Sequence, residues 1–298
     1  MGRWEIGACP VRAAPPVPGV GTLWPMPTAV VTGSQSGMGL AIRGELAAQG
    51  WRVLGVDLPG KGAEVSADLS TDTGRAAAAE ALLAACEGRL DAVAANAGVD
   101  VPRPELAFGV NYFGVVDLLA RLRPALVAAG RARVAVNVSN SIFVTPGIPL
   151  AAVQSLLDGN PVRAARLLEA QPALAYQVSK LAVARWIRES APSPTWAGAG
   201  ISVNGVCPGP VMTPLLERDL ADPRKGPMIR RLPRPLGEFT TPEAVAGLFA
   251  FLLSERARFL VGQLICIDGG NEAAWRASDW PRAWDIELPA FRRLLGPG

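Results

Sequence analysis

The sequence predicts a single α/β domain built on a doubly wound parallel sheet, and three observations lead to this prediction. Short apolar runs that suit buried strands alternate with segments of about ten or more residues that suit helices. A glycine-rich turn joins the first run to the first helical segment, and Asp57 closes the second run. Alternation of this kind produces right-handed βαβ units, whose parallel strands are covered by helices on both faces.

The first half of the chain alternates strand and helix regularly. Gly50 stops the first helix, Asp57 closes the second strand, and the second helix is rich in alanine. We therefore expect strands at 29–32, 52–56, 64–67 and 90–95, and helices at 37–49 and 73–86.

The second half continues the alternation around a more complex stretch. A long helical segment carries Pro124 in its interior, and a later one places Tyr176 and Lys180 about one turn apart. We expect helices at 105–129, 173–190 and 242–254, and strands at 133–138, 201–206 and 263–267. The complete order is that of a Rossmann fold.

Residues 28–270 carry this pattern, and the two ends differ from it in composition. Residues 1–27 are rich in Pro and Gly, and we expect a disordered extension or an upstream start, because Met26 directly precedes the ordered pattern. Residues 271–298 are an aromatic tail, which we expect to pack on the body, over the site or, as we prefer, on a partner subunit. Its aromatic side chains are Trp275, Trp280, Trp284 and Phe291.

The composition argues against several classes of function. The chain has 29 basic and 26 acidic residues and no long basic run, so we expect no nucleic-acid partner. It has no histidine and four scattered cysteines, so we expect no metal site and no histidine acid–base chemistry. No apolar run reaches transmembrane length, so we expect no membrane partner. The scattered cysteines suit the reducing cytoplasm.

The glycine-rich turn predicts a dinucleotide site. Glycines let the backbone turn tightly and approach a pyrophosphate, which then sits on the N-terminus of the following helix. Asp57 lies 57 − 39 = 18 residues after the last glycine, near the offset of about 20 expected for the acid that binds the ribose of NAD. Its carboxylate repels the 2′-phosphate of NADP. Because Lys61 is nearby and could offset this repulsion, NADP is the disfavoured cofactor rather than an excluded one. The candidates in the turn are Gly33, Ser36, Gly37, Met38 and Gly39.

Two further features suggest where the cofactor and the substrate react. Asp68 and Leu69 follow the third strand, where Asp68 either meets the adenine amino group or caps the next helix.

Tyr176 and Lys180, four residues apart on a helix, share one face. A phenol has a pKa near 10, and a nearby ammonium lowers it, so such a tyrosine can exchange a proton with an alcohol.

Together these motifs make the chain resemble the short-chain dehydrogenase/reductases over roughly residues 28–270. The resemblance rests on Thr-Gly-x-x-x-Gly-x-Gly from Thr32, Asn96-Ala97-Gly98, Asn111, a serine after the fifth strand, Tyr-x-x-x-Lys, Pro208-Gly209 and Ile267-Asp268-Gly269-Gly270. It implies a nicotinamide cofactor and the interconversion of alcohols and ketones. It also implies a catalytic tetrad of Asn111, Ser139, Tyr176 and Lys180, and further cofactor contacts from Asn96, Ala97, Gly98, Tyr176, Lys180, Pro208, Gly209, Val211 and Thr213.

The resemblance assigns a role to each member of the tetrad. Tyr176 exchanges the hydroxyl proton, and Lys180 lowers the pKa of Tyr176 and holds the nicotinamide ribose. Ser139 donates a hydrogen bond to the substrate oxygen, and Asn111 holds a water in a proton relay with Lys180. Thr213 is expected to bind the nicotinamide carboxamide.

Two serines are candidates for the catalytic position, because Ser139-Asn140-Ser141 offers two hydroxyls. Family members usually carry paired serines, of which the second is catalytic. The interval 139 − 111 = 28 residues is the one typical of the family. We therefore choose Ser139 and keep Ser141 in reserve.

One stretch departs from the usual family pattern. The interval 176 − 139 = 37 residues is roughly three times the usual one, which indicates an insertion at 145–172. Its apolar spacing predicts two short helices on either side of residues 158–161. A similar insertion occurs in bacterial 3α-hydroxysteroid dehydrogenase/carbonyl reductases, which implies bulky apolar substrates. Alternatively, the insertion packs against another subunit of a homodimer or homotetramer.

Residues 210–236 are expected to form a substrate lid, because the segment is long, Pro-rich and basic at the place where the family carries one.

The leading hypothesis is an NAD(H)-dependent oxidoreductase that interconverts a bulky apolar secondary alcohol and its ketone. The alternatives are a biosynthetic ketoreductase that uses NADPH and a catalytically silent NAD(H)-binding regulatory protein. A sugar-nucleotide epimerase is disfavoured, because that related branch differs in glycine spacing.

Overall fold

The computed structural model describes residues 26–279, 285–287, 289–290 and 293. Its sheet has seven parallel strands in the order β3-β2-β1-β4-β5-β6-β7. The strands are β1 (Thr28–Thr32), β2 (Arg52–Asp57), β3 (Val65–Ser66), β4 (Ala92–Ala95), β5 (Ala132–Asn137), β6 (Ile201–Pro208) and β7 (Leu264–Ile267). Strand order reverses between β1 and β4, the point where such sheets bind ligands. The predicted fold class is confirmed.

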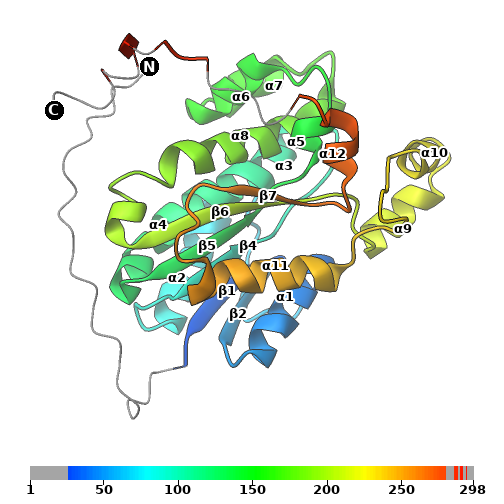
Figure 1. Cartoon of the computed structure of the whole chain (residues 1–298). Helices are drawn as coiled ribbons and strands as arrows, with labels where there is room; N and C mark the ends of the chain where they lie inside the picture. The colour runs from blue at the N-terminus through cyan, green and yellow to red at the C-terminus, as the bar shows by residue number, and fades with distance from the viewer. Residues whose placement is uncertain (1–25, 280–284, 288, 291–292, 294–298) are drawn as a thin grey trace.

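Helices cover both faces of the sheet (Figure 1). Side chains of α1 (Gly37–Ala48) and α11 (Pro242–Leu253) join one apolar cluster with one face of the strands. Those of α2 (Asp72–Ala85), α4 (Gly114–Ala129) and α8 (Ala175–Ser190) join a larger cluster with the other face. Side chains alternate between these faces along a strand, so Val30 of β1 belongs to the larger cluster and Val31 to the smaller one.

Local sequence signals set the ends of several helices. Thr71 begins α2 by accepting a hydrogen bond from the backbone of Gly74, and Thr241 begins α11 by accepting one from Ala244. Gly130 ends α4 with a left-handed φ of 77°, which glycine adopts without strain.

The long helix predicted at 105–129 is one helical stretch with a wider turn inside it. It consists of α3 (Pro104–Phe108), the π-helical turn η1 (Gly109–Phe113) and α4. Asn111 lies at the centre of η1 and is fully buried. Such π-turns often mark functional sites, and periodicity alone does not distinguish them from α-helix.

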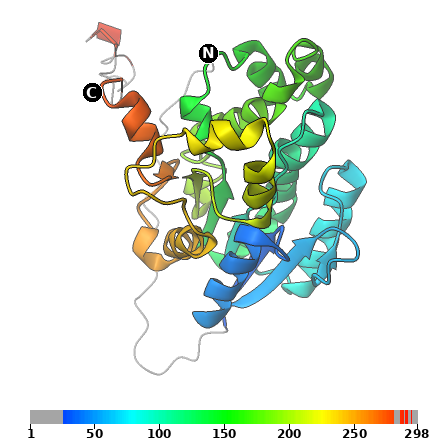
Figure 2. The same cartoon turned by 90° about the vertical axis from the view of Figure 1, so that its right-hand side faces the viewer.

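The insertion and the lid both contain short helices. Short helix α5 (Ser141–Val144) precedes the insertion, whose helices α6 (Leu150–Leu157) and α7 (Pro161–Arg166) are the two that the spacing predicts. The short turn η2 (Pro172–Leu174) then leads into α8. The expected lid, residues 210–236, contains α9 (Pro214–Ala221) and α10 (Lys225–Arg230), which stand out from the body in Figure 1 and cross in front of it in Figure 2.

Three further short helices are η3 (Ala197–Ala199), η4 (Glu255–Ala257) and α12 (Asn271–Arg276). Trp275 on α12 is 58% exposed, so its own chain covers less than half of it. Our expectations for residues 1–25 and for Trp280, Trp284 and Phe291 lie outside the described residues. None of the described helices is both long enough and apolar enough to cross a bilayer.

Candidate active site

The glycine turn closes tightly over the carboxyl end of β1. Gly33 and Gly37 have left-handed φ values of 66° and 50°, and the backbone N–H of Gly33 donates to the carbonyl of Val56 at 2.8 Å. Ser36 begins α1 without a side-chain cap, so the first N–H groups of α1 remain available to an anion. Met38, in the first turn of α1, is only partly buried against the smaller core cluster.

Gly39 leaves no room for a side chain. A Cβ at this position would lie 1.9 Å from the carbonyl oxygen of Gly33 and 2.8 Å from Asn96 Nδ2. We expect Gly39→Ala to displace the turn and to lower the free energy of unfolding by about 1–3 kcal/mol. The displaced turn should no longer bind a dinucleotide. Urea unfolding and calorimetric titration with NAD measure the two effects. Gly44→Ala, on the same helix with no atom near the added Cβ, is the matched control. Unchanged NAD binding in Gly39→Ala would contradict the role of this turn.

Asp57 lies at the end of β2, beside the turn. Its Oδ2 accepts a hydrogen bond from the backbone of Gln35 at 2.9 Å, and its Oδ1 accepts one from the backbone of Leu58 at 2.8 Å. The carboxylate is therefore fixed at the switch edge of the sheet, and each oxygen keeps a lone pair for another donor.

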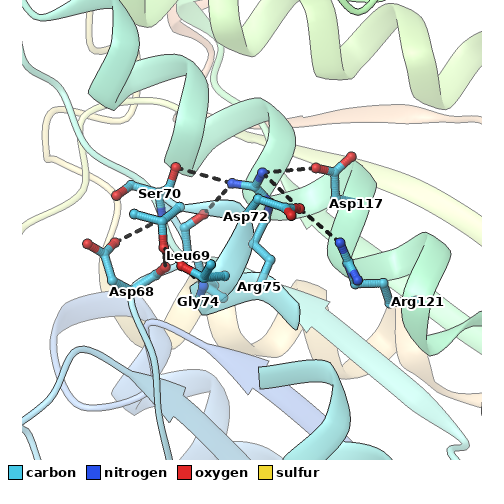
Figure 3. Close-up of polar contacts among 10 residues, drawn as sticks. Asp68, Leu69, Ser70, Asp72, Gly74, Arg75, Asp117 and Arg121 are labelled. Atoms are coloured by element: carbon cyan, nitrogen blue, oxygen red, sulfur yellow. Dashed lines mark hydrogen bonds and ion pairs between the residues drawn. The ribbon is translucent and has the colours of Figure 1, made fainter. Parts of the chain in front are cut away.

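Asp68 lies just before α2 but does not cap it, because the N-cap of that helix is Thr71. Its Oδ1 accepts a hydrogen bond from the backbone of Ser70 at 2.9 Å, just before α2. Leu69 is buried, and its carbonyl oxygen accepts from Arg75 Nη1 at 3.1 Å. Figure 3 shows this guanidinium between the 69–70 backbone and Asp117 of α4. Arg75 therefore holds the start of α2 against α4.

The segment after β4 is fastened to the end of β1 by Thr32, a residue of the glycine motif to which we assigned no role from the sequence. Thr32 Oγ1 accepts hydrogen bonds from the backbone N–H groups of Asn96 at 3.0 Å and Ala97 at 2.9 Å. Asn96 Nδ2 donates in return to the carbonyl of Thr32. Gly98 follows, and a Cβ there would lie 3.2 Å from Asn111 Oδ1 and 3.3 Å from Lys180 Nζ. The segment 96–98 thus covers two members of the expected tetrad.

Asn111 uses its side-chain amide to clamp the backbone. Its Oδ1 accepts from the N–H of Val99 at 2.8 Å, and its Nδ2 donates to the carbonyl of Val99 at 2.9 Å and to Ser179 Oγ at 3.0 Å. Both donors of its side-chain amide bind protein groups, so the water expected next to Lys180 would bind the second lone pair of Oδ1 or the backbone of Asn111. Asn111 therefore fixes the loop beside Lys180, and Ser179 is a partner that we did not foresee.

Ser139, Tyr176 and Lys180 converge at the carboxyl end of β5. The hydroxyl of Ser139 hydrogen-bonds the Tyr176 phenol, and Lys180 Nζ lies 5.8 Å from the centre of the Tyr176 ring. Lys180 is 1% exposed and donates to the carbonyl of Asn137 at 2.6 Å. Ser141 Oγ, our reserve candidate, is buried without a partner among the described residues. The geometry therefore favours Ser139.

The ionisation of Tyr176 differs from our expectation that Lys180 lowers its pKa. Burial of the phenol raises the pKa of Tyr176 to about 12, and the hydrogen bond with Ser139 only partly opposes this. Burial also lowers the pKa of Lys180 to about 8, because its ammonium is removed from water. At neutral pH the protein's own groups thus keep Tyr176 protonated and poised to donate a proton.

The segment after β6 leads from the sheet to the lid. Pro208 ends β6, and Gly209 passes so close to Asp268 that a Cβ at Gly209 would lie 2.8 Å from the Asp268 Cβ. Val211 is 6% exposed and forms an isolated bridge with Thr240. Thr213 caps α9 through Leu216, and its Cγ2 would lie 3.4 Å from a Cβ at Gly37. This segment therefore reaches the glycine turn.

Basic residues of the lid mostly bind the lid itself. Lys225 Nζ lies 2.9 Å from Asp219, Arg230 donates to the carbonyl of Leu220, and Arg234 stacks over Phe239. Burial raises the pKa of Asp100, a carboxyl that we did not consider, while Lys225 draws it down. Asp100 therefore lies within electrostatic range of the lid, next to the Val99 loop held by Asn111.

Models of known families match most of the described chain. Residues 27–151 match the model described as short chain dehydrogenase, and residues 161–272 match the model described as enoyl-(acyl carrier protein) reductase. The two matches meet at the insertion, so that together they take in the glycine turn, the tetrad and the lid.

Individual proteins give a similar result. The 3-alpha-hydroxysteroid dehydrogenase/carbonyl reductase of Comamonas testosteroni is 34% identical over 259 residues, which cover 84% of this chain and 98% of that protein. The crystal structure of the 3-alpha-hydroxysteroid dehydrogenase from Pseudomonas sp. B-0831 complexed with NADH is 39% identical, has a TM-score of 0.78 and covers 84% of this chain and 99% of its own. RhlG of Pseudomonas aeruginosa with NADP shares the fold, with 24% identity, a TM-score of 0.68 and coverage of 83% and 96%.

Proposed function

We propose a function from one premise: the chain belongs to the short-chain dehydrogenase/reductase family. It is an oxidoreductase that acts on secondary alcohols or ketones. Our proposal is that it uses NAD(H) to interconvert a bulky apolar secondary alcohol and its ketone, with Tyr176 as the acid–base group. The observation that carries the proposal is the convergence of Ser139, Tyr176 and Lys180 beside the glycine turn.

The residues present fit a nicotinamide dinucleotide. The turn from Gly33 to Gly39 is packed too tightly for a side chain at Gly39, and the uncapped start of α1 suits the pyrophosphate. Asp57 would hold the adenosine ribose, while Lys180 and Thr213 would hold the nicotinamide half. When bound, this cofactor accepts or supplies the hydride. Asp57 favours NAD over NADP in this proposal, because its carboxylate repels a 2′-phosphate.

The protein's own groups then handle the proton. In reduction, the Tyr176 phenol donates its proton to the substrate carbonyl oxygen as negative charge develops there. The Ser139 hydroxyl donates a hydrogen bond to the same oxygen, which stabilises that charge. Lys180 supports the resulting phenolate, and Asn111 holds the 98–99 backbone against Lys180. Oxidation runs through the same groups in reverse.

The proposal extends to substrate and assembly. The similarity to a 3-alpha-hydroxysteroid dehydrogenase supports steroid-like or polycyclic substrates. We also propose a homodimer or homotetramer, which the half-exposed edge strand β7 and the exposed Trp275 support. The free thiols of Cys86, Cys207 and Cys266 support a cytoplasmic location.

Absorbance at 340 nm tests the proposal directly. The enzyme is mixed with NAD or NADP and a panel of steroid, bicyclic and aromatic secondary alcohols, and in reverse with the reduced cofactors and the matching ketones. NAD-linked turnover of a bulky member is expected. Turnover with NADPH alone would favour the biosynthetic ketoreductase. Cofactor binding without turnover across the panel would favour the regulatory protein.

Asp57→Ala tests the cofactor preference. Loss of one charge-assisted hydrogen bond worth about 1.5–3 kcal/mol should weaken NAD roughly tenfold to a hundredfold, while NADP changes far less. Calorimetric titration with both cofactors measures this. Asp57→Asn, which keeps an acceptor for Gln35 and removes the charge, separates repulsion of the 2′-phosphate from loosening of the turn. An unchanged preference in both variants would remove Asp57 from the cofactor site.

A further inference from the structure

Two buried amides behind Ser139 join three separate parts of the fold. Asn140 follows Ser139 and is 5% exposed, and Asn271 begins α12 and is 2% exposed. Asn140 Nδ2 donates to Asn271 Oδ1 at 2.9 Å, and Asn271 Nδ2 donates to the carbonyl of Pro233 at 2.9 Å. These two bonds form a continuous path from the end of the lid to the residue next to Ser139.

The Asn140 end of the path is anchored by its own backbone and by the side chain of Asp268. The N–H of Asn140 donates to the carbonyl of Pro208 at 2.9 Å, which fixes Asn140 to the end of β6. Asn140 Nδ2 also donates to Asp268 Oδ2 at 3.1 Å. Asp268 in turn accepts from the backbone N–H groups of Gly270 at 3.0 Å and Glu272 at 2.9 Å. The orientation of Asn140 is thus determined by β6, β7 and α12 together.

A second contact joins the same parts. Arg276 of α12 donates through Nη1 to the carbonyl of Phe143 in α5 at 3.1 Å, and the Phe143 N–H donates to the carbonyl of Asn140 at 2.9 Å. Helix α12 therefore holds the 139–144 segment at two points, and Figure 1 shows α12 beside α5 at this edge of the sheet. Arg276 also pairs with Asp279 at 2.6 Å, which restricts its side chain.

Ser139 has little freedom of its own to compensate for movement of this segment. Its Oγ accepts a hydrogen bond from the backbone N–H of Ser141 at 3.1 Å and bonds the Tyr176 phenol. Displacement of about 1 Å at a reacting group can cost about a hundredfold in rate. Small rotations of the Asn140 backbone would therefore move the Ser139 hydroxyl relative to Tyr176.

We propose that Asn140 and Asn271 are positioning residues. They couple the position of the end of the lid, at Pro233, to the position of the Ser139 hydroxyl. The inference rests on the proposed function, because it concerns a hydrogen bond to the reacting oxygen. Buried amides suit this role because each must satisfy its donors and acceptors in one orientation. Serine at position 140 would be too short to bridge to Asp268 and Asn271.

Two variants test the path at separate points: Asn140→Ser and Asn271→Ala. Each is measured alone and in a Ser139→Ala background, with NADH and a ketone that the wild type reduces. In the wild-type background we expect kcat to fall roughly tenfold to a hundredfold, with KM changed by no more than about threefold. In the Ser139→Ala background we expect each variant to change kcat by no more than about twofold, because the group they position is absent.

The matched control is Asn204→Ala. Asn204 is 1% exposed and also joins two segments, donating to the carbonyl of Leu260 at 2.8 Å and accepting from the backbone of Gln263 at 3.0 Å, but it contacts none of the tetrad. We expect this variant to lower the melting temperature while kcat stays within about twofold of wild type.

The outcomes separate the possible readings. Equal losses of kcat with and without Ser139 would overturn the proposal, because the amides would then act on general stability. Unchanged kcat in both variants would also overturn it. Failure of the wild type to turn over any ketone would count against the proposed function itself, and the melting temperatures would show whether the variants remain folded.

Discussion

Tyr176→Phe is expected to reduce turnover by about a hundredfold to ten-thousandfold while NAD still binds. The change removes one oxygen and keeps the ring, so packing around this partly buried side chain is preserved. Burial holds the pKa of Tyr176 at about 12, so the phenol is a proton donor at neutral pH and phenylalanine cannot replace it. Initial rates at 340 nm measure the loss, and calorimetry measures NAD binding.

Tyr112→Phe is the matched control, because Tyr112 is the other of the two tyrosines in the chain. It is 4% exposed, and burial raises its pKa to about 12 as well. Tyr112 belongs to the large core cluster, so its loss should affect stability and leave kcat nearly unchanged. Near wild-type turnover in Tyr176→Phe would overturn the acid–base assignment. If no substrate is turned over by the wild type either, the comparison favours the regulatory protein.

The parts of the site that the sequence predicts best are local. The glycine turn lies within eight consecutive residues, 32–39, and needs only a strand before it and a helix after it. Asp57 follows because β1 and β2 are neighbouring parallel strands whose carboxyl ends meet at one edge. The spacing of Tyr176 and Lys180 similarly needs only a helix. In each case short-range geometry determines which side chains come together.

The contacts that we did not predict join residues far apart in the chain. Asn111 binds Ser179 across 68 positions, and Lys180 binds the carbonyl of Asn137 across 43. The π-turn that carries Asn111 has no signature in the apolar periodicity. Burial raises the pKa of Tyr176, and the hydrogen bond with Ser139 only partly opposes this. Spacing along a helix indicates that two groups meet, but it does not indicate how much water surrounds them.

Lys180→Met is expected to lower kcat by roughly a hundredfold, and its effect on stability should depend on pH. Burial lowers the pKa of Lys180 from 10.5 to about 8, so between these values the unfolded chain binds more protons than the folded one. The free energy of unfolding of the wild type therefore gains a contribution as pH rises through this window. Methionine does not titrate, so this contribution is absent in the variant.

Urea unfolding at pH 7 and pH 9.5 measures the difference. The wild type should gain stability relative to Lys180→Met by about 2 kcal/mol over this interval, because each pKa unit is worth about 1.4 kcal/mol. Lys61→Met, at an exposed lysine, controls for the loss of a positive charge. A difference between wild type and Lys180→Met that stays constant with pH would mean that the ammonium is not desolvated in the folded protein. Lys180 would then be free to lower the pKa of Tyr176, which is the arrangement that the spacing of the two residues first predicted.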